Sequence, residues 1–171
     1  MNIPTLGRLK PHPEIPEWLA AEPQQIPFFD GRKLPITLNS LEEADNQDVE
    51  NAIASFLKLG PADRLAITRY VFANYRRMAE LVSKDDLGCR IESEEAVWKH
   101  VHPSELFISR RHRRDRAIYV SIAAECDWEP EHGLQIIYRR GTELARVSDQ
   151  DGHLTHTDAY DLPEEQDKIN S

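Results

Sequence analysis

Apolar residues recur along this chain with two different spacings, and each spacing predicts a different element. Residues 34–38 alternate apolar and polar side chains, which is the period of a β-strand. The apolar stretch 26–29 lies just before them, across Asp30-Gly31. Asp-Gly favours a hairpin turn because both residues tolerate a positive φ. The pattern therefore predicts an N-terminal hairpin over residues 26–38.

The next stretch has the spacing of helices. A first helix is expected to be capped by Asp45 or Asn46 and to end at Leu59-Gly60-Pro61. Glycine suits the left-handed position after a helix, and proline cannot continue one. Pro61 can then occupy the first turn of a second helix whose apolar stripe reaches Val82. These two segments predict an αα-hairpin, and the polar stretch that begins at Lys84 is expected to be a loop.

From Ala96 onward the strand period returns. Pro103 is expected to interrupt a short edge segment, because proline has no N–H to donate. Four strands should follow, over residues 106–108, 117–124, 134–138 and 144–147. Helices segregated from antiparallel strands indicate an α+β fold with a C-terminal β-meander.

The two ends of the chain differ in composition from its middle. Six prolines fall within the first 27 residues, which disfavours a long helix or a central strand there. We therefore expect a proline-rich, irregular arm over residues 1–25 and a single α+β domain over residues 26–156. Residues 157–171 are acidic and almost free of apolar side chains, so they are expected to form a flexible tail.

Composition restricts the possible settings and partners. The 171 residues carry a formal net charge of -9, which disfavours non-specific binding to nucleic acid. No run approaches the roughly 18 apolar residues of a membrane span, and residues 1–16 lack the apolar core of a signal peptide. Two cysteines are too few for a disulfide scaffold. The expected location is the cytoplasm.

The densest polar chemistry lies in the connection between two expected strands, from Cys126 to Leu134. Its candidate binding residues are Asp127, Trp128, Glu129, Glu131 and His132. Three interpretations are open for this turn. The acidic side chains can tie down the turn by accepting backbone N–H groups. The turn can instead contact a protein or ligand, or it can serve metal binding or catalysis.

The metal interpretation would combine the turn with His153 or His156. Zinc accepts thiolate, imidazole and carboxylate ligands, but the spacing matches no familiar zinc motif. A nucleophilic Cys126 would need His132 as its base, and the acidic neighbours oppose a thiolate by raising the thiol pKa. We predict no metal and no cofactor.

A second candidate is the basic run from Arg110 to Arg116, which should form the tip of a strand connection. Arg111, Arg113 and Arg114 are its candidate binding residues. Guanidinium groups pair well with phosphate, so nucleic acid is one possible target. An acidic protein is another, and a solvated loop with no ligand is the third.

Several of these features together resemble a known family. They are the Ile-Pro-Phe-Phe-Asp-Gly stretch from Ile26, the Val-Trp pair at Val97, and the Cys-Asp-Trp-Glu-x-Glu-His-Gly-Leu motif from Cys126. They are similar to a family of uncharacterised bacterial domains of unknown function, some linked to polymorphic-toxin or immunity loci. The resemblance implies a bacterial, cytoplasmic α+β domain and assigns no catalytic residue.

Taken together, the sequence favours a non-enzymatic, cytoplasmic protein-interaction module of an immunity-like kind, with another protein as its partner. Its contact surface would be the turn from Asp127 to His132, together with the Arg110–Arg116 loop. One alternative is a small metal-dependent enzyme using the Cys126–His132 turn. The other is a nucleic-acid binder using the arginine loop.

Overall fold

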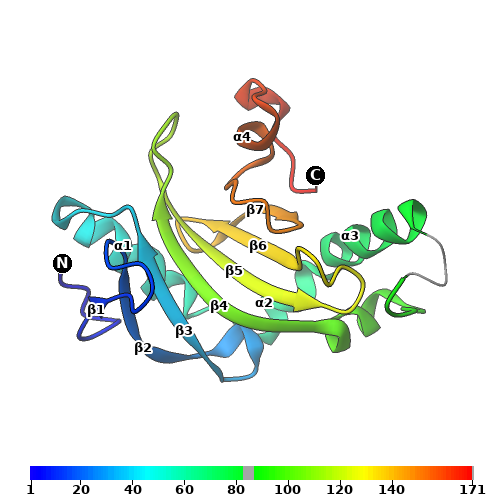
Figure 1. Cartoon of the computed structure of the whole chain (residues 1–171), viewed down its shortest axis with the longest axis horizontal. Coiled ribbons are helices and arrows are strands. Elements are labelled where there is room, and N and C mark those ends of the chain that lie inside the picture. The colour runs from blue at the N-terminus through cyan, green and yellow to red at the C-terminus, as the bar shows by residue number, and fades with distance from the viewer. Residues whose placement is uncertain (83–86, 171) are drawn as a thin grey trace.

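A computed structural model describes residues 1–82 and 87–170 of the chain. In these residues, seven strands form one sheet in the order in which they occur in the sequence. The strands are β1 (Lys10–Pro11), β2 (Leu19–Ile26), β3 (Arg32–Asn39), β4 (Val101–Arg110), β5 (Ile118–Cys126), β6 (Leu134–Arg139) and β7 (Glu143–Ser148). The structure thus combines helices with a sheet, as the α+β expectation requires at this level (Figure 1).

All helices fall between β3 and β4 or after β7, except η1, which lies between β2 and β3. The α-helices are α1 (Asn46–Phe56), α2 (Pro61–Ala66), α3 (Thr68–Leu81) and α4 (His156–Tyr160). Short 3-10 helices are η1 (Pro27–Phe29), η2 (Glu43–Asp45), η3 (Glu94–His100) and η4 (Glu164–Gln166). The expected second helix is therefore two helices separated at Ile67. The loop expected from Lys84 begins inside residues 83–86, which lie outside the described part of the chain.

All neighbouring strands pair antiparallel except β3 and β4, which pair in parallel. Pairs such as Ile36 with Leu106 define this parallel register. The helical segment α1–α3 and η3 forms the connection between the two strands. A parallel connection needs such a long crossover, whereas the antiparallel pairs use short turns.

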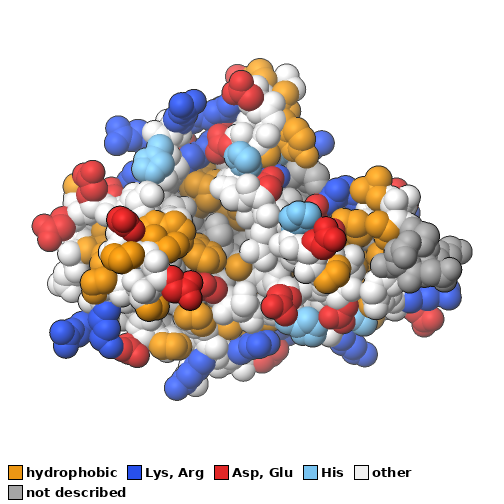
Figure 2. Space-filling model, viewed as in Figure 1, with side chains coloured by type: hydrophobic (Ala, Val, Ile, Leu, Met, Phe, Trp, Pro, Cys, Tyr) orange, Lys and Arg blue, Asp and Glu red, His pale blue; other side chains and the backbone are white. Residues whose placement is uncertain are grey.

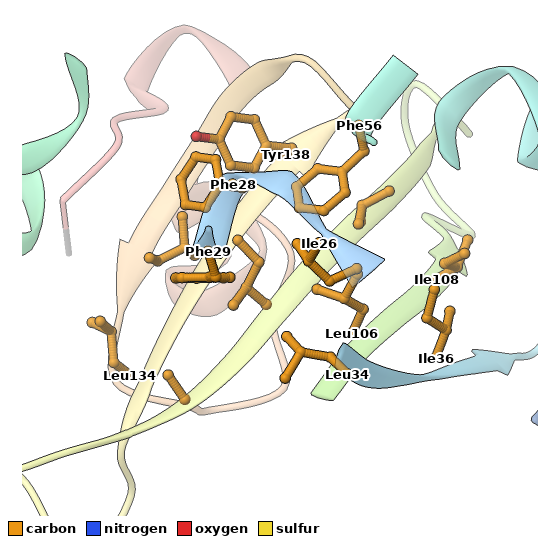
Figure 3. Packing of buried hydrophobic residues seen from close by; sticks show 14 of the residues in the cluster. Ile26, Phe28, Phe29, Leu34, Ile36, Phe56, Leu106, Ile108, Leu134 and Tyr138 are labelled. Carbon is orange, nitrogen blue, oxygen red and sulfur yellow. The ribbon is translucent and has the colours of Figure 1, made fainter. Parts of the chain in front are cut away.

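The core lies between the helices and one face of the sheet. In β5, Ile118, Val120 and Ile122 point into this core. Phe28, on η1 at the β2–β3 turn, and Phe56 of α1 meet Tyr138 of β6 there, with ring centroids 5.7–6.2 Å apart (Figure 3). The intervening residues of β5 point to the opposite face. On that face a small second cluster forms around Tyr119 and Ile137.

Two expectations about the N-terminal and central prolines are wrong. Residues 19–25 were assigned to an irregular arm but lie in β2, where the register shifts between Ala21 and Gln24 and so accommodates Pro23. Pro103 does not interrupt β4 either, because the register shifts between Pro103 and Glu105. A β-bulge removes the need for the N–H that proline lacks.

The acidic C-terminal segment is also more ordered than expected. Residues 156–160 form α4, and Thr157 in it is fully buried. Further along, the Val147 N–H of β7 donates to the carbonyl of Ile169 at 2.8 Å. Acidic side chains of this segment pair with arginines of the β4–β5 loop, which the sequence pattern could not show. Within the described residues, no helix is both long and apolar enough to cross a membrane.

Candidate functional site

The turn between β5 and β6 is anchored to the rest of the domain through Trp128. This side chain is only 2% exposed and packs edge-on against Tyr75 of α3. Its indole N–H donates to Oδ1 of Asn74 at 2.9 Å. Trp128 therefore belongs to the core and offers little surface to a partner.

Glu129 is the carboxylate that accepts backbone N–H groups in the turn, as the tied-down-turn interpretation predicts for its acidic side chains. Oε1 of Glu129 accepts the backbone N–H groups of Glu131 and His132, both at 3.1 Å. The same oxygen lies 3.3 Å from Nδ1 of His132. Glu131, another of the candidate binding residues, is exposed. Glu129 thus organises the turn, as acidic side chains in turns commonly do.

Asp127 was expected to hold backbone N–H groups but instead contacts two imidazoles. Its carboxylate lies 2.8 Å from Nδ1 of His100 and 2.7 Å from Nε2 of His102. Burial acts to raise the pKa of Asp127, but the hydrogen bonds with the two histidines outweigh it and hold this pKa below its usual range.

Cys126 is buried, and its Sγ lies 3.8 Å from the carbonyl oxygen of Glu129. Burial raises the pKa of the Cys126 thiol to about 12. A thiol with this pKa is a poor nucleophile at neutral pH, because the thiolate is the reactive form. The arrangement therefore speaks against a catalytic Cys126.

The potential metal ligands are only partly brought together. Among the described residues, ligand atoms of Glu129, Glu131 and His132 lie within 4.8 Å of one another, and neither His153 nor His156 belongs to this group. The His153 ring lies beside Asp151, and the His156 ring packs against Tyr160. The Glu129 oxygen that would bind a metal already holds the turn, so this group has a structural explanation.

The β4–β5 loop divides the predicted arginines into buried and exposed ones. Arg111 was expected to lie on a solvated tip, but its side chain is only 4% exposed. It donates to both carboxylate oxygens of Asp158 at 2.7 Å, and to Glu164 at 2.8 and 3.1 Å. The hydroxyl of Thr155 accepts a further hydrogen bond at 3.0 Å. Arg111 is buried because α4 and η4, which carry Asp158 and Glu164, pack beside the loop.

These contacts shift the pKa values of both Arg111 and Glu164. Hydrogen bonds from Arg111 are the main reason why the pKa of Glu164 falls to about 2. Burial of Arg111 acts to lower the pKa of its guanidinium, but the hydrogen bonds to Asp158 and Glu164 outweigh burial and raise it. Arg111 is therefore a structural cation, closed off from an external partner.

The remaining arginines of the loop lie closer to solvent. Arg110 forms ion pairs with Asp45 and Asp48 at 2.8 and 2.7 Å, and Arg114 contacts Glu164 at 2.5 Å. Arg113 is exposed and makes no ion pair with any residue that the structure describes. Of the three arginines predicted to bind, only Arg113 has an uncommitted charge.

A groove that the sequence did not predict lies on the sheet face opposite α1–α3. We call it the sheet-face groove; it is a cavity of about 320 Å³ lined mainly by Asn39, Phe107, Ser109, Ser121, Gln135 and His153. Around residues 152–154 it adjoins a second hollow of about 370 Å³ that is lined by Arg110–Arg114. Figure 2 shows this face hollowed near its centre, below the basic side chains of the loop.

A signal for this groove was present in the strand pattern. Ser121 and Ala123 alternate with the core residues of β5, and Ser109 does the same in β4. Small or polar residues on the second face of a strand indicate that this face lacks a helical cover. The curvature that turns the face into a groove required the structure.

A comparison with protein families places the chain. Residues 5–154 match the model of a domain of unknown function, DUF6985, and this range contains all seven strands of the sheet and all the helices before β4. The chain belongs to this family. The resemblance to an uncharacterised domain family is thereby confirmed, and DUF6985 itself assigns no activity to any residue. The match ends at residue 154, before Asp158 and Glu164, the two acids that accept hydrogen bonds from Arg111. No curated protein and no solved structure matches the chain.

Proposed function

We propose that this DUF6985 domain is a non-enzymatic protein-interaction module that binds an acidic segment of a partner protein in the sheet-face groove. The observation that carries the proposal is the free sheet face itself, with its polar lining and its adjoining basic loop. The turn from Asp127 to His132 is not part of this surface, because its indole and its main carboxylate serve the fold.

The lining of the groove has unused hydrogen-bonding capacity. Oδ1 of Asn39 is buried and accepts no hydrogen bond from any described residue. The hydroxyls of Ser109 and Ser121 also make no side-chain hydrogen bond among the residues that the structure describes. Buried polar groups normally have partners, so an incoming peptide backbone can supply the one that Asn39 lacks, and the half-buried serine hydroxyls can bond to it as well.

The rim of the groove supplies an aromatic anchor and positive charge. Trp18 packs edge-on against Phe107, with ring centroids 6.4 Å apart, and Phe107 lines the groove. At the adjoining hollow, His112 and Arg113 are both exposed. Aromatic residues and arginine are enriched at protein interfaces, and the uncommitted charge of Arg113 favours an acidic segment.

A bacterial cytoplasmic setting and an immunity-like role form part of this proposal. In an immunity-like role, the partner would be a toxin domain that presents the acidic segment. The nucleic-acid alternative receives less support, because Arg110, Arg111 and Arg114 are neutralised within the domain. The metal-enzyme alternative receives less support as well, because Glu129 is committed to the turn.

A peptide selection tests the proposal. A phage library of random peptides is selected on the purified chain, and enriched peptides are measured by fluorescence polarisation against the parent and Ser121→Trp, which fills the groove. Ala73→Trp is the matched control, because it places the same indole on the exposed side of α3. We expect acidic peptides whose affinity falls at least about tenfold in Ser121→Trp and stays at the parent value in the control.

Two results would refute the proposal. One is an enriched set without an excess of acidic residues. The other is equal binding to the parent and to Ser121→Trp, provided that circular dichroism shows the variant to be folded. Phe107→Ala removes the aromatic anchor without adding bulk, so it provides a second variant for the same comparison, with its fold checked in the same way.

A further inference from the structure

A separate cavity lies between α1, the β4–β5 loop and the β6–β7 turn. It has a volume of about 460 Å³, which is within the range of small-molecule sites. We call it the α1–turn cavity. Its polar side chains include Asn51 and Ser55 from α1, Arg116 from the loop and Arg140 from the turn. It does not share these four residues with the sheet-face groove.

The two arginines occupy an unfavourable backbone conformation. Arg116 has φ 53° and Arg140 has φ 51°, both in the left-handed region. Residues with a side chain adopt this region at an energetic cost, and glycine or asparagine would fill the same positions more easily. Strained residues of this kind concentrate at functional sites. The backbone strain at both arginines is therefore a reason to look for a ligand of their guanidinium groups.

The cavity is also lined by two carboxylates, Asp48 and Asp115, and both are already paired with arginines. Asp48 pairs with Arg110 at 2.7 Å, and Asp115 pairs with Arg139 at 2.7 Å. Asp115 also accepts the hydroxyl of Tyr119 at 3.0 Å. The local carboxylates therefore have little capacity left to attract a further cation.

The guanidinium groups of Arg116 and Arg140, in contrast, have no side-chain hydrogen bond or ion pair with any described residue. On the opposite wall, Oδ1 of Asn51 accepts from Gln47 at 3.0 Å, which leaves the Asn51 amide N–H groups available. The Ser55 hydroxyl can donate as well. The cavity thus offers two positive charges and two neutral donors to one anion.

The wall that carries Arg140 is fixed firmly against α1. A Cβ placed on the neighbouring Gly141 would lie 2.0 Å from the carbonyl oxygen of Ala52 and 3.1 Å from the N of Phe56. The turn and the helix backbone are therefore in direct contact, and only glycine allows this approach. This contact fixes the backbone position of Arg140, and a fixed backbone lowers the entropic cost of bringing its guanidinium to an anion.

We propose that the α1–turn cavity binds a phosphate group, with Arg116 and Arg140 as its charged ligands and Asn51 and Ser55 as neutral donors. Guanidinium pairs with phosphate oxygens in a fork, and two of them match the charge of a phosphate dianion. The group can come from free phosphate or from a small phosphorylated molecule. This inference is independent of the proposed peptide groove.

Isothermal titration calorimetry with inorganic phosphate and with adenosine monophosphate tests the site at low ionic strength. We expect saturable one-to-one binding of one or both. Tighter binding of the nucleotide identifies a phosphorylated molecule as the source, and tighter binding of phosphate identifies the free ion. Arg116→Asn and Arg140→Asn tolerate the left-handed backbone, and each should weaken binding at least about tenfold.

Arg113→Asn is the matched control, because it removes the same charge from the same loop but does not line the cavity. Its affinity should stay within about twofold of the parent's. If Arg116→Asn, Arg140→Asn and Arg113→Asn all weaken anion binding equally, the loss is explained by net charge alone and the proposal is overturned. So would the absence of saturation by both probes up to about 10 mM, or an equal heat signal from acetate. Thermal melts of each variant establish that it is folded.

Discussion

Arg111 provides the sharpest test of how the arginine loop is used. Replacing it by methionine keeps much of the apolar stem but removes the guanidinium. The substitution deletes hydrogen bonds to Asp158 and Glu164 and leaves both carboxylates without their main partner. We expect Arg111→Met to lower the free energy of unfolding substantially.

The magnitude follows from the exposure of the partners. Breaking a fully buried ion pair costs about 3–5 kcal/mol, because the remaining charge stays buried. Here the side chains of Asp158 and Glu164 are 23% and 48% exposed, so water can partly replace the guanidinium. We therefore expect a loss of about 2–4 kcal/mol. Arg113→Met should cost no more than about 0.5 kcal/mol, as exposed substitutions usually do.

Urea denaturation followed by circular dichroism measures both variants. An Arg111→Met midpoint equal to the parent's, with an unchanged slope, would refute the structural role of this residue. An equal loss in Arg113→Met would trace the effect to net charge instead. A double-mutant cycle with Asp158→Asn should give a coupling of at least about 1 kcal/mol between the two side chains.

Three further predictions follow from other contacts. Trp128→Ala should cost about 3–5 kcal/mol in urea melts and the half-buried Trp18→Ala clearly less, so equal losses would contradict a core role for the first indole. The depressed pKa of Glu164 stabilises the fold above pH 4.5 and this contribution disappears as pH falls towards about 2. Solvent screening limits this contribution to about 1 kcal/mol. The prediction is refuted if the parent and the Glu164→Gln variant lose the same amount of stability over this pH interval. Gly141→Ala should cost about 2–4 kcal/mol because its Cβ would meet a carbonyl oxygen of α1, whereas Gly31→Ala, with similar φ and open space, should cost only about 1–2 kcal/mol in thermal melts.

The pattern of apolar and polar residues predicted much of the local structure. Alternation marked residues of β5 that face the core, and Asp30-Gly31 marked the reversal of the chain between β2 and β3. It did not predict that β2 would continue across Pro23. A bulge is a property of the strand pair, and a single strand's pattern does not contain it.

The candidate site was harder to predict, because it depends on contacts between distant residues. Trp128 meets Asn74, and Arg111 meets Glu164. The local sequence around Trp128 and Arg111 does not indicate these partners, so the sequence analysis predicted both residues to be exposed binding residues. Burial of a polar or amphipathic side chain is decided by tertiary packing, and the local composition of a loop is a poor guide to it.

The parallel pairing of β3 with β4 imposes an order on how the chain acquires its sheet. Strands β4–β7 are joined by short turns and can pair as soon as they are made. Asn39 can meet Ser109 only after the whole helical crossover between them has been brought to closure. Such distant contacts carry the larger entropic cost and form slowly. During synthesis the edge of β3 therefore stays unpaired until β4 has been made, and an unpaired strand edge is a site at which a nascent chain can aggregate.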